Sequence, residues 1–221
     1  MIITTHIGWD DTLRRINMEN LFGLINSSEI MLKQNLTDFK ERVDSEASKM
    51  SENEKQEYFE YLGDEYWQLS EVFPQVSRRA LFAICYSTVE FGLNRLCRAV
   101  YADSLCVSPV PKRTNLNNSK KYLMDKVKLS QEALQDYWDR LDSYRFIRNR
   151  VIHHDATLKD DKHSETTREF ISKEPSISIG QFDKIELGDD FCINFAQFVN
   201  TFIDQLVSEL RKKPAIVQAD P

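Results

Sequence analysis

The chain has 221 residues, of which 41% are hydrophobic and only six are glycine and six proline, so it is long enough for one substantial domain built from long elements. No apolar run reaches the length of a membrane span, and the N-terminus lacks the basic start and apolar stretch of a secretory signal, so we expect a cytoplasmic protein that does not bind membranes. The formal net charge of −6 argues against a protein that coats nucleic acid without sequence preference, although a local basic site remains compatible with it.

The first third of the chain predicts two helices. Apolar side chains recur at mostly helical intervals over residues 10–48. Ser51 and Glu54 form a capping box, so a second helix should begin there and continue to about residue 72, where Pro74 should break it. Its aromatic residues predict core or interface packing rather than a base-stacking platform, and they are Tyr58, Phe59, Tyr61, Tyr66 and Trp67.

A third helix is predicted over residues 76–102, with the broad apolar side that is typical of a helix in the middle of a bundle. Glu90 lies within this apolar stretch. It should either face water or be buried beside a cation, for which an arginine near Arg148 is a candidate. Prolines and asparagines then predict a loop over residues 105–119, followed by a short helix over residues 120–127.

The next predicted helix covers residues 131–154, with Ser130 as its N-cap. A regular apolar spacing predicts a buried stripe along it, made of Leu134, Trp138, Leu141, Tyr144, Ile147 and Val151. The polar groups near the end of this helix should flank the stripe and reach a cleft or an interface.

The last third of the chain predicts a mobile polar loop over residues 155–174 and then a small β-hairpin from residues 176–179 and 184–187. Phenylalanines at helical spacing predict a final core helix over residues 190–212. From Pro214 onward we expect a disordered tail.

Cysteine and histidine usage predicts no metal site. No C-x-x-C pair and no metal-ligand spacing occurs, so we expect four buried, reduced thiols, at Cys85, Cys97, Cys106 and Cys192. The adjacent His153 and His154 point about 100° apart on a helix and cannot easily hold one ion. We therefore expect no structural zinc and no cofactor.

The most informative segment is Arg148-Asn149-Arg150-Val151-Ile152-His153-His154. Arginine stays charged at any working pH and its planar fork suits phosphate, whereas histidine titrates near neutrality and can transfer protons. On a helix, Asn149 and His153 share a face, and Arg145 extends that stripe. The long stem of Arg148 can bring its guanidinium beside the same face. This combination indicates chemistry on a phosphodiester.

A helix end explains the same residues without any chemistry. Basic side chains are favoured in the last turn because they complement the negative end of the helix dipole. Arg148, Arg150, His153 and His154 all occupy such positions, and short motifs have a real false-positive rate.

The pattern Arg148-Asn149-x-x-x-His153 at the end of a core helix resembles the signature of the HEPN superfamily, in which an arginine, often followed by asparagine, precedes a histidine by four to six residues. The segment from Tyr86 to Leu96 is similar to the second core helix of such proteins, and Lys121-Tyr122-Leu123 is similar to the stretch before the motif helix. The resemblance covers residues 76–212 best.

The resemblance implies a mainly α fold, a helical bundle of HEPN type with a small β-hairpin before the last helix. It implies one domain with an N-terminal helical extension (residues 1–75), a core (76–212) and a disordered tail (213–221). It also implies a metal-independent endoribonuclease, acting as a toxin or anti-phage defence effector. Because the chain has one motif, a homodimer should form the composite site, with an antitoxin or defence-complex protein as a further partner.

In such a site His153 would be the general base or acid, and Arg148 would stabilise charge on the phosphoryl oxygens. Asn149 would orient either His153 or the phosphate. Supporting roles are expected for Glu90, Arg145 and His154. RNA would be cut by attack of its own 2′-OH, leaving a 2′,3′-cyclic phosphate and a 5′-OH, and DNA would be spared.

Two features of the motif leave alternatives open. Toxins of this superfamily that pair with a nucleotidyltransferase often have a tyrosine two residues after the histidine, where this chain has Asp155, a carboxylate that would raise the pKa of His153 or repel RNA. His154 gives a second allowed spacing from Arg148. The alternative functions are a catalytically inactive module that binds RNA or a partner protein, and a structural helical dimer in which the motif only caps a helix.

Overall fold

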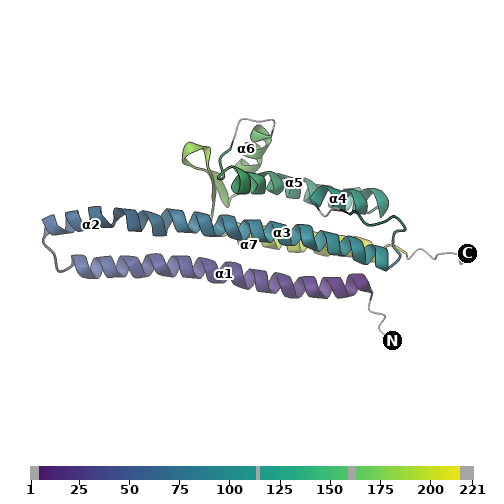
Figure 1. Cartoon of the computed structure of the whole chain (residues 1–221), viewed down its shortest axis with the longest axis horizontal. Coiled ribbons are helices and arrows are strands. Elements are labelled where there is room, and N and C mark those ends of the chain that lie inside the picture. Colours follow the sequence, from purple (N-terminus) through teal and green to yellow (C-terminus); the bar gives the residue numbers. More distant parts are fainter. Residues whose placement is uncertain (1–4, 113–114, 159–162, 215–221) are drawn as a thin grey trace, which may run out of the picture.

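The computed structural model describes residues 5–112, 115–158 and 163–214 and shows a mainly α-helical protein with a small hairpin before the last helix. Helix α1 (His6–Ala47) lies beside a long rod formed by α2 (Glu52–Trp67), a π-helical turn (Gln68–Val72) and α3 (Phe73–Ala102) (Figure 1). Helix α7 (Phe191–Arg211) packs against both α1 and α3. Within the described ranges, no helix has the length and apolar character needed to cross a bilayer.

The break that the sequence predicts at Pro74 is wrong, because the rod continues through it. Pro74 lies in the first turn of α3, directly after the π-helical turn. The N–H of Phe73 donates to the carbonyl of Gln68, five residues back rather than four. Such a turn shifts the hydrogen-bond register, so the N–H that proline lacks is tolerated without ending the helix.

A second layer lies over α3. It begins with α4 (Leu116–Lys121) and a further π-helical turn (Tyr122–Lys126), and continues with α5 (Gln131–His153). The predicted N-cap is confirmed, since the Ser130 hydroxyl accepts a hydrogen bond from the N–H of Ala133 at 3.3 Å.

The chain then forms α6 (Ser164–Lys173) and the hairpin of β1 (Ile177–Ile179) and β2 (Ile185–Leu187), which pair antiparallel with Ser178 opposite Glu186. The mobile loop predicted over residues 155–174 is wrong for the part that forms α6, where Thr167 and Ile171 are buried. The hairpin is confirmed. The disorder predicted after Pro214 concerns residues 215–221, which lie outside the described residues.

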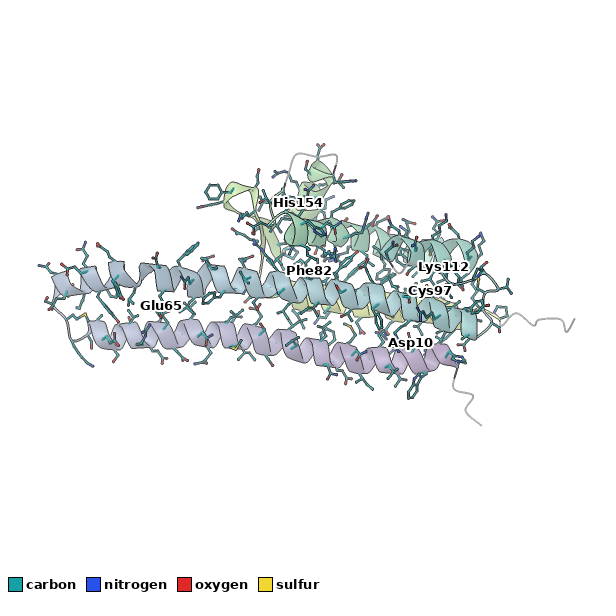
Figure 2. The ribbon with its side chains drawn as sticks, in the orientation of Figure 1. Asp10, Glu65, Phe82, Cys97, Lys112 and His154 are labelled. Carbon is teal, nitrogen blue, oxygen red and sulfur yellow. The ribbon has the colours of Figure 1, made fainter. Side chains whose placement is uncertain are left out.

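The main core lies between α3, α5 and α7. Phe82 on α3 is fully buried between the two layers, with its ring centroid 5.0 Å from those of Phe191 and Phe195 (Figure 2). Each such side chain stabilises the fold by about 1.5–3 kcal/mol relative to leaving it exposed. The predicted stripe of α5 is buried from Leu134 to Ile147, and Val151 packs against its edge. The four cysteines are free and buried, as predicted.

The far half of α1 and all of α2 stand apart from this core. We call residues 30–67 the arm, and in Figure 1 its outer end consists of these two helices alone. Apart from Ala47, its buried hydrophobic residues in the described structure form a separate small cluster of Phe39, Val43 and Leu62. Of the five aromatics for which the sequence predicts core or interface packing, four lie outside the core, because a pair of helices covers only one side of each. Interface packing of these four stays a prediction. The exposed four are Phe59, Tyr61, Tyr66 and Trp67.

Candidate functional site

The end of α5 is fixed by its own backbone. The carbonyl of Arg150, in the last turn of α5, accepts hydrogen bonds from the N–H groups of both His154 (3.0 Å) and Ala156 (2.9 Å), so the chain beyond the helix end supplies a donor to it. Asp155 (φ 49°) and Ala156 (φ 60°) adopt left-handed conformations to make this turn. His153 is therefore the last residue of the helix, and the chain leaves it abruptly.

The segment after the turn is held against the hairpin. The N–H of Ile185 donates to the carbonyl of Ala156 at 2.9 Å, and that of Leu158 donates to Asp183 at 2.9 Å. Lys184 donates to the Asp155 carboxylate at 2.5 Å, and Arg79 lies 3.6 Å from the same group. The hydrogen bond from Lys184 holds the pKa of Asp155 below its usual value. The carboxylate beside the motif is thus bound to Lys184, in the turn of the hairpin, and lies near Arg79 of α3.

Arg148 is half-buried between α5 and α3. Its Nη1 donates to Oδ1 of Asn149 at 3.1 Å, and its guanidinium carbon lies 5.9 Å from the centre of the Tyr86 ring. Its Nε is buried without a hydrogen-bond partner. Among the described residues no carboxylate lies within ion-pair distance of Arg148, so the contact with Asn149 is its one polar partner there.

The two histidines differ in their surroundings. His153 is exposed, and its imidazole has no partner among the residues that the structure describes. His154 is half-buried and occupies the C-cap position of α5, beside the hairpin (Figure 2). Since Asn149 and His153 are four residues apart on α5, they share a helix face. The geometry therefore favours His153 over His154 as the side chain that meets a substrate.

Two of the three residues expected in supporting roles, Arg145 and Glu90, form other contacts in the structure. Arg145 donates from Nε to Asp142 at 2.9 Å, and its guanidinium lies over the Phe146 ring. Glu90 accepts a hydrogen bond from the backbone N–H of Leu116 at 3.3 Å, at the start of α4. Within the described ranges Glu90 forms no ion pair with an arginine, so the pairing suggested by the sequence is not found there.

Tyr86 is a site residue that the motif did not point to. It is 1% exposed, and its hydroxyl has no hydrogen-bond partner among the described residues, although the Arg148 guanidinium lies near its ring. Burial, followed by the charge of Glu90, raises the pKa of Tyr86 far above its usual value, so the hydroxyl stays protonated. The sequence gives no signal for this contact, because an apolar helix position is enough to explain the tyrosine.

Comparison of the chain with protein-family models, with curated protein sequences and with solved structures gives no significant match in any of the three. The part of the chain that the structure describes brings together no group of three or more His, Cys, Asp or Glu side chains that could hold a metal ion.

Proposed function

We propose that this protein is an endoribonuclease that needs no metal ion and that cleaves RNA with Arg148, Asn149 and His153. The observation that carries the proposal is a cation without a carboxylate partner at the end of α5, in the same turns as an exposed imidazole. Most other arginines in the described structure bind carboxylates or carbonyls, as Arg78 and Arg140 do. A guanidinium left with an amide neighbour has donors to offer to a phosphate.

The chemistry follows from what each group can do. The imidazole of His153 accepts the proton of a ribose 2′-OH, and the 2′-oxygen attacks the adjacent phosphorus. As the 2′-oxygen bonds to phosphorus, negative charge builds on the phosphoryl oxygens, where Arg148 donates hydrogen bonds. The bond to the 5′-oxygen then breaks, and charge moves to that leaving oxygen. Asn149 holds the guanidinium through its Oδ1, so the donors meet the phosphate in one orientation. The leaving 5′-oxygen takes up a proton.

A second acid is needed on the side of the leaving group, because the imidazole that removes the first proton lies on the other side of the phosphorus. His153 is the exposed histidine of the motif, and His154 lies half-buried at the helix cap. We therefore propose that two copies of the chain pair their α5 ends, so that the His153 of each contributes to one composite site.

The test is cleavage of a structured RNA by the purified protein in the presence of EDTA. Wild type should leave 2′,3′-cyclic phosphate ends, while His153→Ala and Arg148→Ala should each slow the chemical step by about 10²–10⁴-fold. Asn149→Ala should have a smaller effect, because it only orients Arg148. A DNA of the same sequence should stay intact, since it lacks the attacking hydroxyl.

Two control variants separate site chemistry from loss of charge. Arg98 is an exposed arginine of α3, and His6 is an exposed histidine that binds Asp103. Arg98→Ala and His6→Ala should leave cleavage unchanged. If wild type is inert while folded and dimeric, the ribonuclease proposal fails, and RNA binding that depends on Arg148 would favour an inactive binding module instead.

A further inference from the structure

Helix α2 carries nearly all of the net charge of the protein. Its 16 residues contain six acidic side chains against one lysine, a net charge of −5, whereas the whole chain has a net charge of −6. All six carboxylates are exposed. Within the described structure, those of Glu57 and Asp64 have no hydrogen-bond or ion-pair partner. A charge concentrated on one exposed helix creates a local field that attracts cations and repels phosphate.

The same helix exposes large aromatic side chains. The exposed fractions are 83% for Tyr61, 59% for Trp67, 48% for Phe59 and 45% for Tyr66. Phe59 and Tyr66 are the two of these that line a common groove. A large exposed apolar surface on a soluble protein often marks a site that binds a partner.

An open groove of about 330 Å³ runs between α1 and α2 beside these aromatics. Its floor includes Phe39, Val43 and Leu62, and Phe59 and Tyr66 form part of its walls. A Cβ added at Gly63 would meet nothing within 4 Å, so the glycine leaves this wall open. Lys40 and Asp44 of α1 also line the groove, and the Lys40 ammonium lies over the Tyr66 ring. The groove is therefore apolar along its floor, with the acidic helix α2 on one side and one charge of each sign from α1 on the other.

The arm is an incomplete helical layer. Its two helices are joined by the ion pair of Arg42 with Glu65 at 2.7 Å, by Tyr58 with Glu46, and by the tilted ring contact of Phe39 with Tyr66. In Figure 2 the labelled Glu65 lies between α1 and the rod. Few side chains are buried by these contacts, and helices in proteins gain most of their stability from packing an apolar face against other elements. A third helix laid in the groove would cover the face that α1 and α2 leave open.

We propose that the arm binds a basic amphipathic helix of a partner protein. The apolar side of that helix would pack on Phe39, Leu62 and Phe59, and its lysines and arginines would meet the carboxylates of α2. Charge complementarity selects this occupant, because the net charge of −5 on α2 disfavours nucleic acid and any acidic helix. The proposal does not depend on the ribonuclease activity.

The probe is a synthetic helical peptide about as long as α2, with leucines on one face and lysines on the other. A peptide with glutamate in place of lysine and a scrambled leucine–lysine peptide serve as references. Calorimetry on the full chain should show one binding site for the patterned basic peptide, weaker at higher salt. Hydrogen exchange should show added protection confined to the arm.

Two double variants test separately the apolar and the charged contributions to peptide binding. Phe59→Ser with Tyr66→Ser, and Glu60→Lys with Asp64→Lys, should each weaken peptide binding by at least about tenfold. Phe182→Ser removes an exposed phenylalanine outside the arm, and Glu19→Lys with Asp125→Lys makes the same charge change elsewhere. These controls should bind the peptide as wild type does. Circular dichroism confirms that each variant keeps its helices.

The proposal is overturned if the acidic or scrambled peptide binds equally well, or if the control variants weaken binding as much as the arm variants. It is also overturned if wild type self-associates in light scattering and Phe59→Ser with Tyr66→Ser abolishes this, because the groove then belongs to a second copy of the chain. Binding of RNA to the arm would overturn it as well.

Discussion

Arg148 and Tyr86 meet at the boundary between α5 and α3, and each carries a buried polar atom without a partner among the described residues. A buried polar group that loses its hydrogen bonds to water costs about 1–3 kcal/mol. The cation–π contact of the Arg148 guanidinium with the Tyr86 ring offsets part of that cost. The ring of Tyr86, rather than its hydroxyl, is therefore what positions Arg148.

Tyr86→Phe should raise the free energy of unfolding by about 1 kcal/mol, because it removes the unpaired hydroxyl and keeps the ring. Chemical denaturation measures this directly. Cleavage of RNA, where wild type shows it, should be retained. A loss of stability in this variant would mean that the hydroxyl has a hydrogen-bond partner in solution.

Tyr144 supplies the matched comparison on α5. Its hydroxyl donates to Glu174 at 3.1 Å and lies 3.3 Å from Nη2 of Arg140. Tyr144→Phe should therefore lower the free energy of unfolding by about 0.5–1.5 kcal/mol, the usual worth of a buried hydrogen bond. If the two substitutions change the free energy of unfolding in opposite directions, then the hydrogen-bond partners of the hydroxyl, and not its loss as such, decide the effect.

The motif could be read from the sequence because its residues are local, whereas its surroundings could not. Arg148, Asn149 and His153 lie within two turns of one helix, so the shared face of Asn149 and His153, and the position of Arg148 beside it, follow from helix geometry. The contact with Tyr86 and the engagement of Asp155 by Lys184 depend on how distant segments pack. Contacts between such distant segments leave no periodic pattern in the sequence.

At the scale of elements, the structure differs from the prediction where the backbone hydrogen bonds of a segment can be formed in more than one way. Pro74 reads as a helix break, yet a π-helical turn accommodates it. Residues 164–173 read as a polar loop because few of them are apolar, although Thr167 and Ile171 suffice to pack α6. The bounds of strongly periodic helices such as α5 and α7 were predicted to within a residue or two, because each apolar stripe is compatible with only one helix and one buried face.

The ion pair of Asp155 with Lys184 links the end of α5 to the hairpin and gives a pH-dependent contribution to stability. Because Lys184 lowers the pKa of Asp155, the pair stabilises the folded state above the normal carboxyl pKa of about 4 and is lost as pH falls through the lowered value. The effect is small, since both side chains are largely exposed.

The difference in unfolding free energy between wild type and Asp155→Asn should be present at neutral pH, begin to fall near pH 4 and vanish once the pH is below the lowered pKa of Asp155. Denaturation curves over a pH series measure it. A difference that stays constant down to the lowest pH would contradict the role assigned to the ion pair.

On the scale of the whole molecule, the first and last helices hold each other in place. Arg14 on α1 donates to Asp204 on α7 at 2.5 Å, to Asn200, and to Asp11 at 2.7 Å. Burial tends to raise the pKa of Asp11, but its hydrogen bond with Arg14 and the nearby arginines bring it below the usual value. Beneath this network, apolar residues of α1 join the main core, namely Ile7, Met18, Leu21 and Ile25.

Arg14→Ala should lower the free energy of unfolding by about 3 kcal/mol, because it leaves the buried Asp11 carboxylate with weaker partners. Lys33→Ala is the control: its ion pair with Asp189 also joins distant segments, but both side chains are more than half exposed. That substitution should cost less than about 1 kcal/mol. Equal effects of the two substitutions in thermal or chemical denaturation would argue against a special role for the buried pair.

The pairing of α1 with α7 has a consequence for how the protein is made. Arg14 and Asp204 are 190 residues apart, so α1 leaves the ribosome long before the helix that covers it. At roughly 5–20 residues per second, this delay is roughly 10–40 s. Helix α3 is made early in that interval and can cover its side of α1, whereas the part of α1 that packs on α7 stays uncovered until α7 emerges. The nascent chain should therefore expose this part of the apolar face to chaperones and reach its native packing only after α7 emerges.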